Sequence, residues 1–136
     1  ILYNKGKTIS SVVLEDLMEV SGVNSQEQLA ELEDIYVDKI RKKWLNSGVV
    51  IHNPNTVFIG DDVIIEPDVE IHQNTVIKGK CTLEKGAVIG PNCYLEHSTV
   101  CNDTILQGHN ILVNAIIHEH ELLEFGAHVI EETPYE

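Results

Sequence analysis

Basic residues are scarce in this sequence of 136 residues, and their scarcity excludes several functions. Arginine occurs once, at Arg41, Lys85 is the last lysine, and the formal net charge is −13. Nucleic acid and anionic membranes are not expected partners, because binding either requires clustered Lys and Arg. Sites for phosphate-bearing substrates also use Arg or Lys, yet residues 86–136 contain eight carboxylates and neither basic residue. This part of the chain is therefore a poor candidate for a phosphate site.

Long apolar runs and paired cysteines are lacking as well. No apolar run approaches the length that spans a bilayer, and the N-terminus has no basic segment followed by an apolar one and a cleavage site. The three cysteines are odd in number and form no CxxC pair, which suits a reducing compartment. These features predict a cytoplasmic protein with no membrane partner.

The N-terminal segment, residues 1–24, is too short to form a core of its own. It begins with Ile1 rather than Met, and its strand-like run at residues 8–14 has no obvious neighbouring strand. We therefore expect the chain to be a piece of a longer protein, with residues 1–24 the remnant of a preceding domain.

A long helix is predicted next, within a linker at residues 25–48. Ser25 and Gln28 form an S-x-x-Q capping-box pattern, so the helix should begin near Gln26, and "NSG" at 46–48 should end it with Gly48 in the left-handed cap position. Apolar residues at spacings of three and four predict one buried stripe. They are Leu29, Leu32, Tyr36, Ile40 and Trp44. The basic cluster "RKKW" at 41–44 is interpreted as complementing the helix dipole.

A six-residue period begins at Val57. Seven successive pairs place a small residue two positions before an aliphatic one: Val57/Ile59, Val63/Ile65, Val69/Ile71, Thr75/Ile77, Cys81/Leu83, Ala87/Ile89 and Cys93/Leu95. Residues two apart lie on one face of a strand, and the intervening Gly, Pro, Asn and Asp favour tight turns. Short strands repeated without helices predict a parallel β-helix over residues 49–136, with three strands and about eighteen residues in each coil.

The same pattern explains two of the cysteines. Cys81 and Cys93 occupy the small slots beside the corners, where a bulkier side chain would overpack the core. Core packing is therefore the preferred interpretation over a redox or metal role.

The period is interrupted after Leu95. The next pairs that fit are His109/Ile111, Ala115/Ile117, Glu121/Leu123 and Ala127/Val129. The step from 93 to 109 is two residues short of three repeats, so "HSTVCNDTILQG" should contain a shortened turn or a change of register. Glu121 in a small inward slot leaves the structure of the last coil open.

The order of these features resembles a known family. Gly22-Val23-Asn24, the helix, "GVVIHNPNT" at 48–56 and hexads including "DTILQG" resemble, over roughly residues 7–112, the bifunctional bacterial GlmU family. Its members combine an N-acetylglucosamine-1-phosphate uridyltransferase with a glucosamine-1-phosphate N-acetyltransferase. The resemblance implies a mainly β fold, a left-handed parallel β-helix of hexapeptide repeats preceded by one long α-helix.

The resemblance also implies partners and cofactors. The parent enzyme would use UTP, sugar phosphates and acetyl-CoA, with Mg²⁺ for uridyl transfer, and would form a homotrimer. Asn24 matches the family's GVN asparagine, which helps hold Mg²⁺ and UDP-N-acetylglucosamine, although one amide oxygen cannot make a magnesium site alone. An idle turn or cap residue remains the alternative for Asn24 in this chain.

The acetyltransferase site is not expected here. The family has "GPFA-x-x-RP" about where "FGAHVIEETP" stands at 125–134, and Phe125, Ala127 and His128 echo it without an arginine. We expect no catalytic residue, no cofactor and no activity in this chain alone.

Two other functions stay open. One is a non-catalytic trimeric scaffold that presents an acidic surface. The other is a zinc-dependent protein similar to the gamma class of carbonic anhydrases, because His118 and His120 lie two apart in "IHEHE" and imidazole pairs bind zinc. Histidines on a solvated face are the simpler interpretation of that pair.

Overall fold

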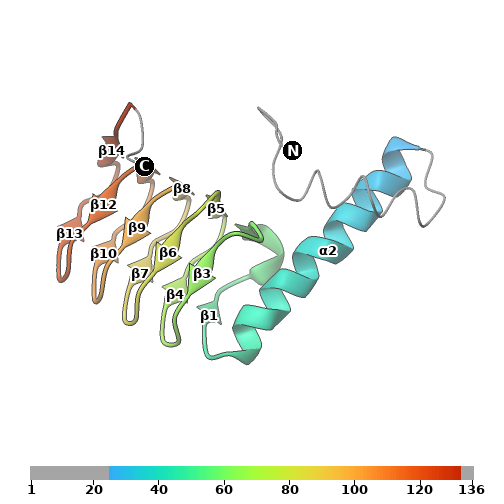
Figure 1. The fold of residues 1–136 in the computed structure, drawn as a ribbon, viewed down its shortest axis with the longest axis horizontal. Coiled ribbons are helices and arrows are strands. Elements are labelled where there is room, and N and C mark those ends of the chain that lie inside the picture. Colours follow the sequence, from blue (N-terminus) through green and yellow to red (C-terminus); the bar gives the residue numbers. More distant parts are fainter. Residues whose placement is uncertain (1–24, 133–136) are drawn as a thin grey trace.

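A single long helix precedes a stack of short parallel strands in the computed structural model, which describes residues 25–132 (Figure 1). The strands wind into a left-handed β-helix of about five turns, so the predicted fold class is confirmed. No helix within residues 25–132 combines the length and apolarity needed to cross a membrane.

The helix, α2 (Gln26–Asn46), begins and ends where the sequence predicts. The Ser25 hydroxyl accepts a hydrogen bond from the backbone N–H of Gln28 at 3.2 Å, which satisfies one free donor of the first turn. At the other end Gly48 adopts a φ of 99° and its N–H donates to the carbonyl of Leu45. These two caps fix the length of the helix, because residues before and after them leave helical geometry.

The buried face of α2 differs from the predicted stripe. Ile40 and Trp44 pack partly buried against the coils, but the fully buried positions are Val37 and Arg41. Arg41 is only 5% exposed, and its Nη1 donates to the carbonyl of Val57 at 3.0 Å. Its role is therefore to join the helix to the first coil, which the interpretation of "RKKW" as a dipole complement did not include.

The strands form three parallel sheets, one on each side of the coil (Figure 1). The first sheet contains β1 (Val50–Ile51), β4 (Glu70–Ile71), β7 (Val88–Ile89), β10 (Ile105–Leu106) and β13 (Leu122–Leu123). The second contains β2 (Phe58–Ile59), β5 (Val76–Lys78), β8 (Tyr94–Glu96), β11 (Ile111–Val113) and β14 (His128–Ile130). The third contains β3 (Ile64–Ile65), β6 (Thr82–Leu83), β9 (Thr99–Val100) and β12 (Ile116–Ile117). A short 3-10 turn, Pro54–Thr56, lies between β1 and β2.

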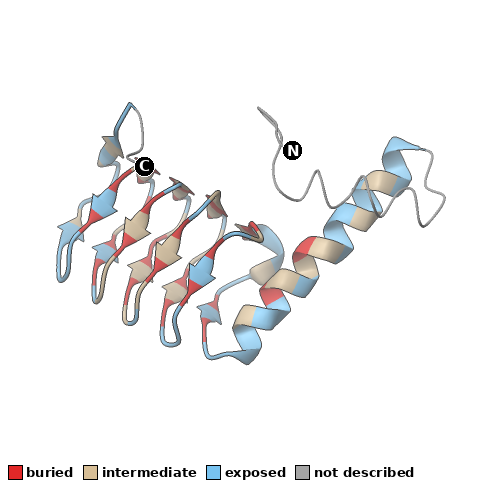
Figure 2. Cartoon of the chain, in the orientation of Figure 1, coloured by how far each residue is buried: buried red, intermediate tan, exposed pale blue. Residues whose placement is uncertain are grey.

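The core runs as columns of aliphatic side chains through the middle of the prism. One column per sheet stacks the second strand residue of each coil, such as Ile59, Ile77, Leu95 and Leu112 in the second sheet, all 0% exposed. Figure 2 shows that buried residues alternate with intermediate or exposed ones along the strands from β1 to β12. This alternation is the six-residue beat of the sequence, since the residues between inward positions face solvent.

The number of residues per coil decreases along the stack. Val50 of β1 lies beside Glu70 of β4, a step of 20 residues. Glu70 lies beside Val88, a step of 18, and Val88 beside Ile105, a step of 17. The predicted eighteen-residue coil is therefore correct for the middle of the stack, with a longer first coil and shorter later ones.

One corner accounts for the shorter coils. Gly79 and Lys80 together form the corner after β5, whereas His97 alone forms it after β8 and Asn114 alone after β11. His97 and Asn114 have φ values of 52° and 54°, so a single left-handed residue makes the turn. The predicted shortened turn is confirmed.

The predicted inward pair His109/Ile111 is wrong by one position. Asn110 and Leu112 are both 0% exposed, while His109 lies exposed at a corner with a φ of 56°. The physical reason is that the corner at His97 loses one residue and so shifts the following pairs by one position, whereas the second missing residue is lost only at Asn114, after this pair. The shift also creates two inward pairs that the hexad spacing does not predict, Ser98/Val100 and Thr104/Leu106.

The last described coil is less buried than the others. Ala115 and Ile117 are buried as predicted, but Glu121 is exposed and Leu123, Ala127 and Val129 are only partly buried. A carboxylate is tolerated in this inward slot because, among the described residues, another coil covers this coil on one side and not on the other.

Candidate functional site

The one site residue carried over from the family cannot be placed. Asn24 and the strand-like run at 8–14 lie outside the described residues, as does the whole of residues 1–24. The magnesium and sugar-nucleotide contact assigned to Asn24 therefore stays a prediction, and so does the division of the chain at residues 24 and 48.

The predicted packing role of the cysteines is confirmed. Cys81 and Cys93 are 1% and 2% exposed and line the core. Burial raises the pKa of both thiols, so both stay protonated near neutral pH. Each sulfur also contacts the next coil, where Ser98 donates its N–H to Cys81 Sγ at 3.4 Å.

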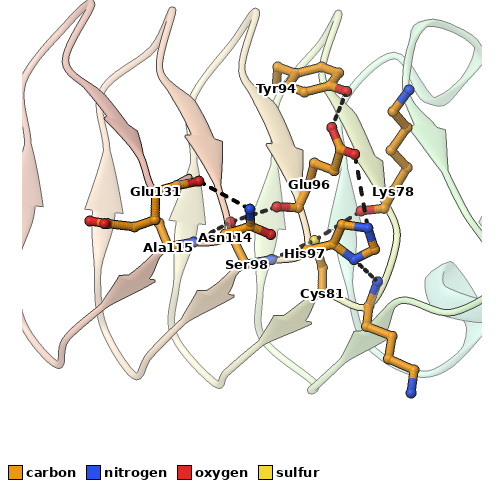
Figure 3. Close-up of polar contacts among 10 residues, drawn as sticks. Lys78, Cys81, Tyr94, Glu96, His97, Ser98, Asn114, Ala115 and Glu131 are labelled. Carbon is orange, nitrogen blue, oxygen red and sulfur yellow. Dashed lines mark hydrogen bonds and ion pairs between the residues drawn. The ribbon is translucent and has the colours of Figure 1, made fainter. Parts of the chain in front are cut away.

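A hydrogen-bonded corner lies next to Cys81 (Figure 3). The Tyr94 hydroxyl donates to Glu96 Oε1 at 2.7 Å, and burial together with this bond raises the pKa of Tyr94 to about 12. The Ser98 hydroxyl donates to the Glu96 carbonyl and accepts from the Ala115 N–H. The two Ser98 contacts satisfy backbone groups that the one-residue corner would leave unpaired, so their role is structural.

His118 and His120 contact different neighbours. His120 sits at a corner with a φ of 62°, and its Nδ1 lies 3.9 Å from a carboxylate oxygen of Asp103. The backbone N–H of His118 donates to Glu121 Oε1 at 2.9 Å. Among the described residues, neither histidine belongs to a group of three side chains close enough to hold a metal ion.

The segment that echoes the family's acetyltransferase motif is open to solvent. Phe125 is 67% exposed, and His128 of β14 is exposed as well. Glu124 and Glu131 flank them, so the local charge repels a phosphate.

A shallow groove lies between α2 and the first coil. Its lining includes Glu33, Asp34 and Arg41 from the helix, and residues 55–58 from the coil. The Arg41 guanidinium is already held by the Val57 carbonyl and by Asp38, 3.5 Å from Nη2. With two carboxylates at the rim and its cation engaged, the groove does not suit an anionic ligand.

The structure brings together three side chains that the sequence analysis did not connect, His52, Glu70 and His72. They lie on the outer face of the first sheet, where β1 and β4 run side by side near the end of α2 (Figure 1). The imidazoles of His52 and His72 are stacked, with centroids 4.5 Å apart and planes 18° from parallel. In the part of the chain that the structure describes, this is the group of His, Cys, Asp or Glu residues whose spacing permits metal binding.

The register of the first coil explains why the sequence does not reveal this cluster. With eighteen residues per coil, His52 would align with Glu70 and not with His72. The 3-10 turn Pro54–Thr56 lengthens this coil to 20 residues, so Ile51 lies beside Ile71 and His52 beside His72. The extra residues within "HNPNT" are the signal that could have found the pair.

The fold and its outward sites define a class before any comparison. The chain is a hexapeptide-repeat protein. It consists of a left-handed parallel β-helix that follows a capped helix, and residues 86–136 contain no Lys or Arg.

Sequence comparisons then connect the chain to one family. It is 34% identical over 129 residues, 95% of its length, to the bifunctional protein GlmU of Streptococcus thermophilus. It is 30% identical over 116 residues, 85% of its length, to that of Heliobacterium modesticaldum, and 51% identical over 70 residues, 52% of its length, to that of Fervidobacterium nodosum. The chain is a relative of the GlmU family, as its motifs predict.

The matches cover a small part of those relatives. The chain spans 26%, 25% and 16% of the three proteins, respectively. No family model matches the chain. Among solved structures, the N-terminal domain of CcmM in complex with CcmN is similar at 19% identity over 64% of this chain and 85% of that one, with a TM-score of 0.23, which is too low to carry an argument.

Proposed function

We propose that this chain is the connecting helix and first β-helix coils of a bifunctional cytoplasmic enzyme that makes UDP-N-acetylglucosamine, and that it is inactive alone. The observation that carries the proposal is the similarity to GlmU proteins, which at 95% coverage includes the helix and the coils together. In this proposal residues 1–24 end a uridyltransferase domain, residues 25–48 link the two halves, and residues 49–136 begin the acetyltransferase half.

The parent enzyme would take UTP, sugar phosphates and acetyl-CoA, with Mg²⁺ in the uridyltransferase. Asn24 would contribute one oxygen to the magnesium site and contact UDP-N-acetylglucosamine. The inactivity of the chain alone is supported by the lack of Arg and Lys from residue 86 onward, because both sugar phosphates and coenzyme A need cations to bind them.

Two assays test the proposal. Uridyl transfer to N-acetylglucosamine-1-phosphate and acetyl transfer to glucosamine-1-phosphate are measured for the product of the complete reading frame and for this chain. We expect turnover only for the former. Turnover by this chain, or none by the complete product, would contradict the proposal.

A second candidate function is a non-catalytic trimeric scaffold. It is favoured by aliphatic side chains on the outer face of the third sheet, where Ile64 is 60% exposed and Ile116 is 61% exposed. Burying such side chains between copies would stabilise a trimer by about 25 cal/mol per Å² of apolar surface. Sedimentation equilibrium decides whether the chain assembles, and a trimer with no turnover from the complete product would favour the scaffold.

A further inference from the structure

The strongest unassigned feature outside the GlmU-like functions is the cluster of His52, Glu70 and His72. Glu70 points one carboxylate oxygen, Oε2, at both imidazoles. His52 Nε2 lies 2.7 Å from this oxygen and His72 Nε2 lies 3.3 Å from it. All three candidate ligand atoms lie within 4.8 Å of one another.

These distances are close to those that one metal ion imposes on its ligands. A zinc ion binds imidazole nitrogen and carboxylate oxygen at about 2.0–2.2 Å, so two ligands of a tetrahedral ion stand roughly 3.4 Å apart. The three side chains come from adjacent strands held in fixed register by backbone hydrogen bonds, such as His52 N–H to the Ile71 carbonyl at 2.9 Å. Small rotations of half-exposed side chains would bring their ligand atoms to these separations.

We propose that His52, Glu70 and His72 bind a first-row transition-metal dication of the zinc type, one per chain. Two imidazoles and a carboxylate form a donor set that suits zinc, cobalt or nickel, whereas Mg²⁺ prefers oxygen ligands throughout. Each imidazole binds through Nε2 and keeps its proton on Nδ1. The side chains are 45%, 39% and 31% exposed, so the remaining coordination position is open to water.

The bound ion would act as a clamp between the first two coils. His52 lies after β1 of the first coil, and the other two ligands lie in and directly after β4 of the second. A metal that binds only the folded chain stabilises it, so the thermal midpoint rises with the free metal concentration. The metal would lie near the end of α2, so it would hold the first coil of the β-helix against the second.

The test measures zinc binding to the full chain by isothermal titration calorimetry, with zinc chloride as the titrant under reducing conditions. We expect one zinc per chain and a rise in the thermal midpoint with zinc. His52→Gln/His72→Gln should weaken the binding more than about 100-fold, because losing a ligand costs more than losing an outer-shell partner, which costs about 10–100-fold. Glu70→Gln should weaken it by a smaller factor.

The matched control is His118→Gln/His120→Gln, which also removes two exposed histidines flanked by glutamates. This variant should bind zinc with the same stoichiometry and affinity as the unsubstituted chain. Cobalt provides a second readout. A thiolate-to-cobalt charge-transfer band would reveal coordination by a cysteine instead, such as Cys101, the third cysteine, which is free and partly exposed. Zinc binding that survives His52→Gln/His72→Gln, a thiolate band, or the absence of stoichiometric binding to the folded chain would overturn the proposal.

Discussion

Arg41 shows how one side chain can hold two elements together. It is buried in α2, donates to the Val57 carbonyl, and has Asp38 beside it, while its Nε is buried with no partner in the described structure. The helix therefore contacts the coil through a buried cation as well as through Ile40 and Trp44. A buried charge of this kind is costly to disturb, because removing one partner leaves the other unpaired.

We predict that Arg41→Ala destabilises the chain by about 1–3 kcal/mol, since the Val57 carbonyl loses its charged donor and a cavity forms under the helix. Urea denaturation followed by circular dichroism measures the change. The control is Lys42→Ala. Its side chain is 69% exposed and, among the described residues, forms an ion pair with Asp38 alone, so the effect should stay below about 1 kcal/mol. Equal effects for the two variants would contradict the assigned role of Arg41.

Asn110 is a second residue whose environment fixes its identity. It is 0% exposed, and its Nδ2 donates to the carbonyls of Glu124 and Ala127 at 2.8 and 3.0 Å. Its Oδ1 accepts from the Gly108 N–H at 3.0 Å. This amide joins the last two described coils through one buried N–H and two partly buried carbonyls.

We predict that Asn110→Leu destabilises the chain by about 2 kcal/mol, although leucine is more hydrophobic, because one buried and two partly buried backbone groups lose their partners at once. Thermal denaturation measures it. Asn102→Ala is the matched control, since Asn102 is partly exposed and makes one side-chain bond of 3.3 Å, to the Lys85 carbonyl. A stable Asn110→Leu variant would show that the buried amide contributes little.

At the scale of elements, turns vary more than strands. The bounds of α2 can be predicted because the capping residues Ser25 and Gly48 mark them in the local sequence. The inward pairs up to Leu95 follow from the six-residue period. The shift at His97 and the longer first coil at Pro54–Thr56 cannot be predicted in this way. The number of residues in a corner depends on backbone contacts with the neighbouring coil. The same limit hid the His52 cluster, which exists only in the lengthened register.

Gly90, which follows β7, tests how closely neighbouring coils approach. A Cβ at this position would come nearer to the Leu106 carbonyl oxygen than real Cβ atoms do, with the Gln107 carbonyl carbon at 2.5 Å. Gly60 follows β2 in the same way, but its nearest neighbour would be the Lys78 Cα at an ordinary 3.5 Å.

We predict that Gly90→Ala destabilises by about 1–3 kcal/mol, because backbone must shift to admit the methyl group. Gly60→Ala should be neutral within about 1 kcal/mol, since alanine also restricts the unfolded chain. Chemical denaturation of both variants measures the difference. A Gly90→Ala protein as stable as Gly60→Ala would mean that the coils separate without cost.

At the scale of the whole molecule, stability should depend on alkaline pH. Burial and the hydrogen bond to Asp61 raise the pKa of Tyr36 to about 12, and burial with the bond to Glu96 does the same for Tyr94. A group with a raised pKa in the folded state stabilises below its unfolded pKa, which is near 10 for tyrosine. Above that pH the unfolded chain loses the proton first.

We therefore predict that the thermal midpoint falls as pH rises from about 10 to 12. The fall should be shallower in Tyr36→Phe/Tyr94→Phe, which removes both phenols. The remaining slope would include Cys81 and Cys93, whose pKa values burial also raises. Midpoints measured in reductant across this range check the prediction, and an identical slope in the double variant would contradict it.

The regular stacking of the coils has a consequence for distance. Each coil adds its strands to the sheets one ladder spacing further along, and neighbouring strands in a ladder stand about 4.8 Å apart. Inserting or deleting one coil would change the separation between whatever adjoins α2 and whatever lies beyond β14 by that single increment. The number of coils in the β-helix therefore sets the distance between two attached units, in steps of one ladder spacing.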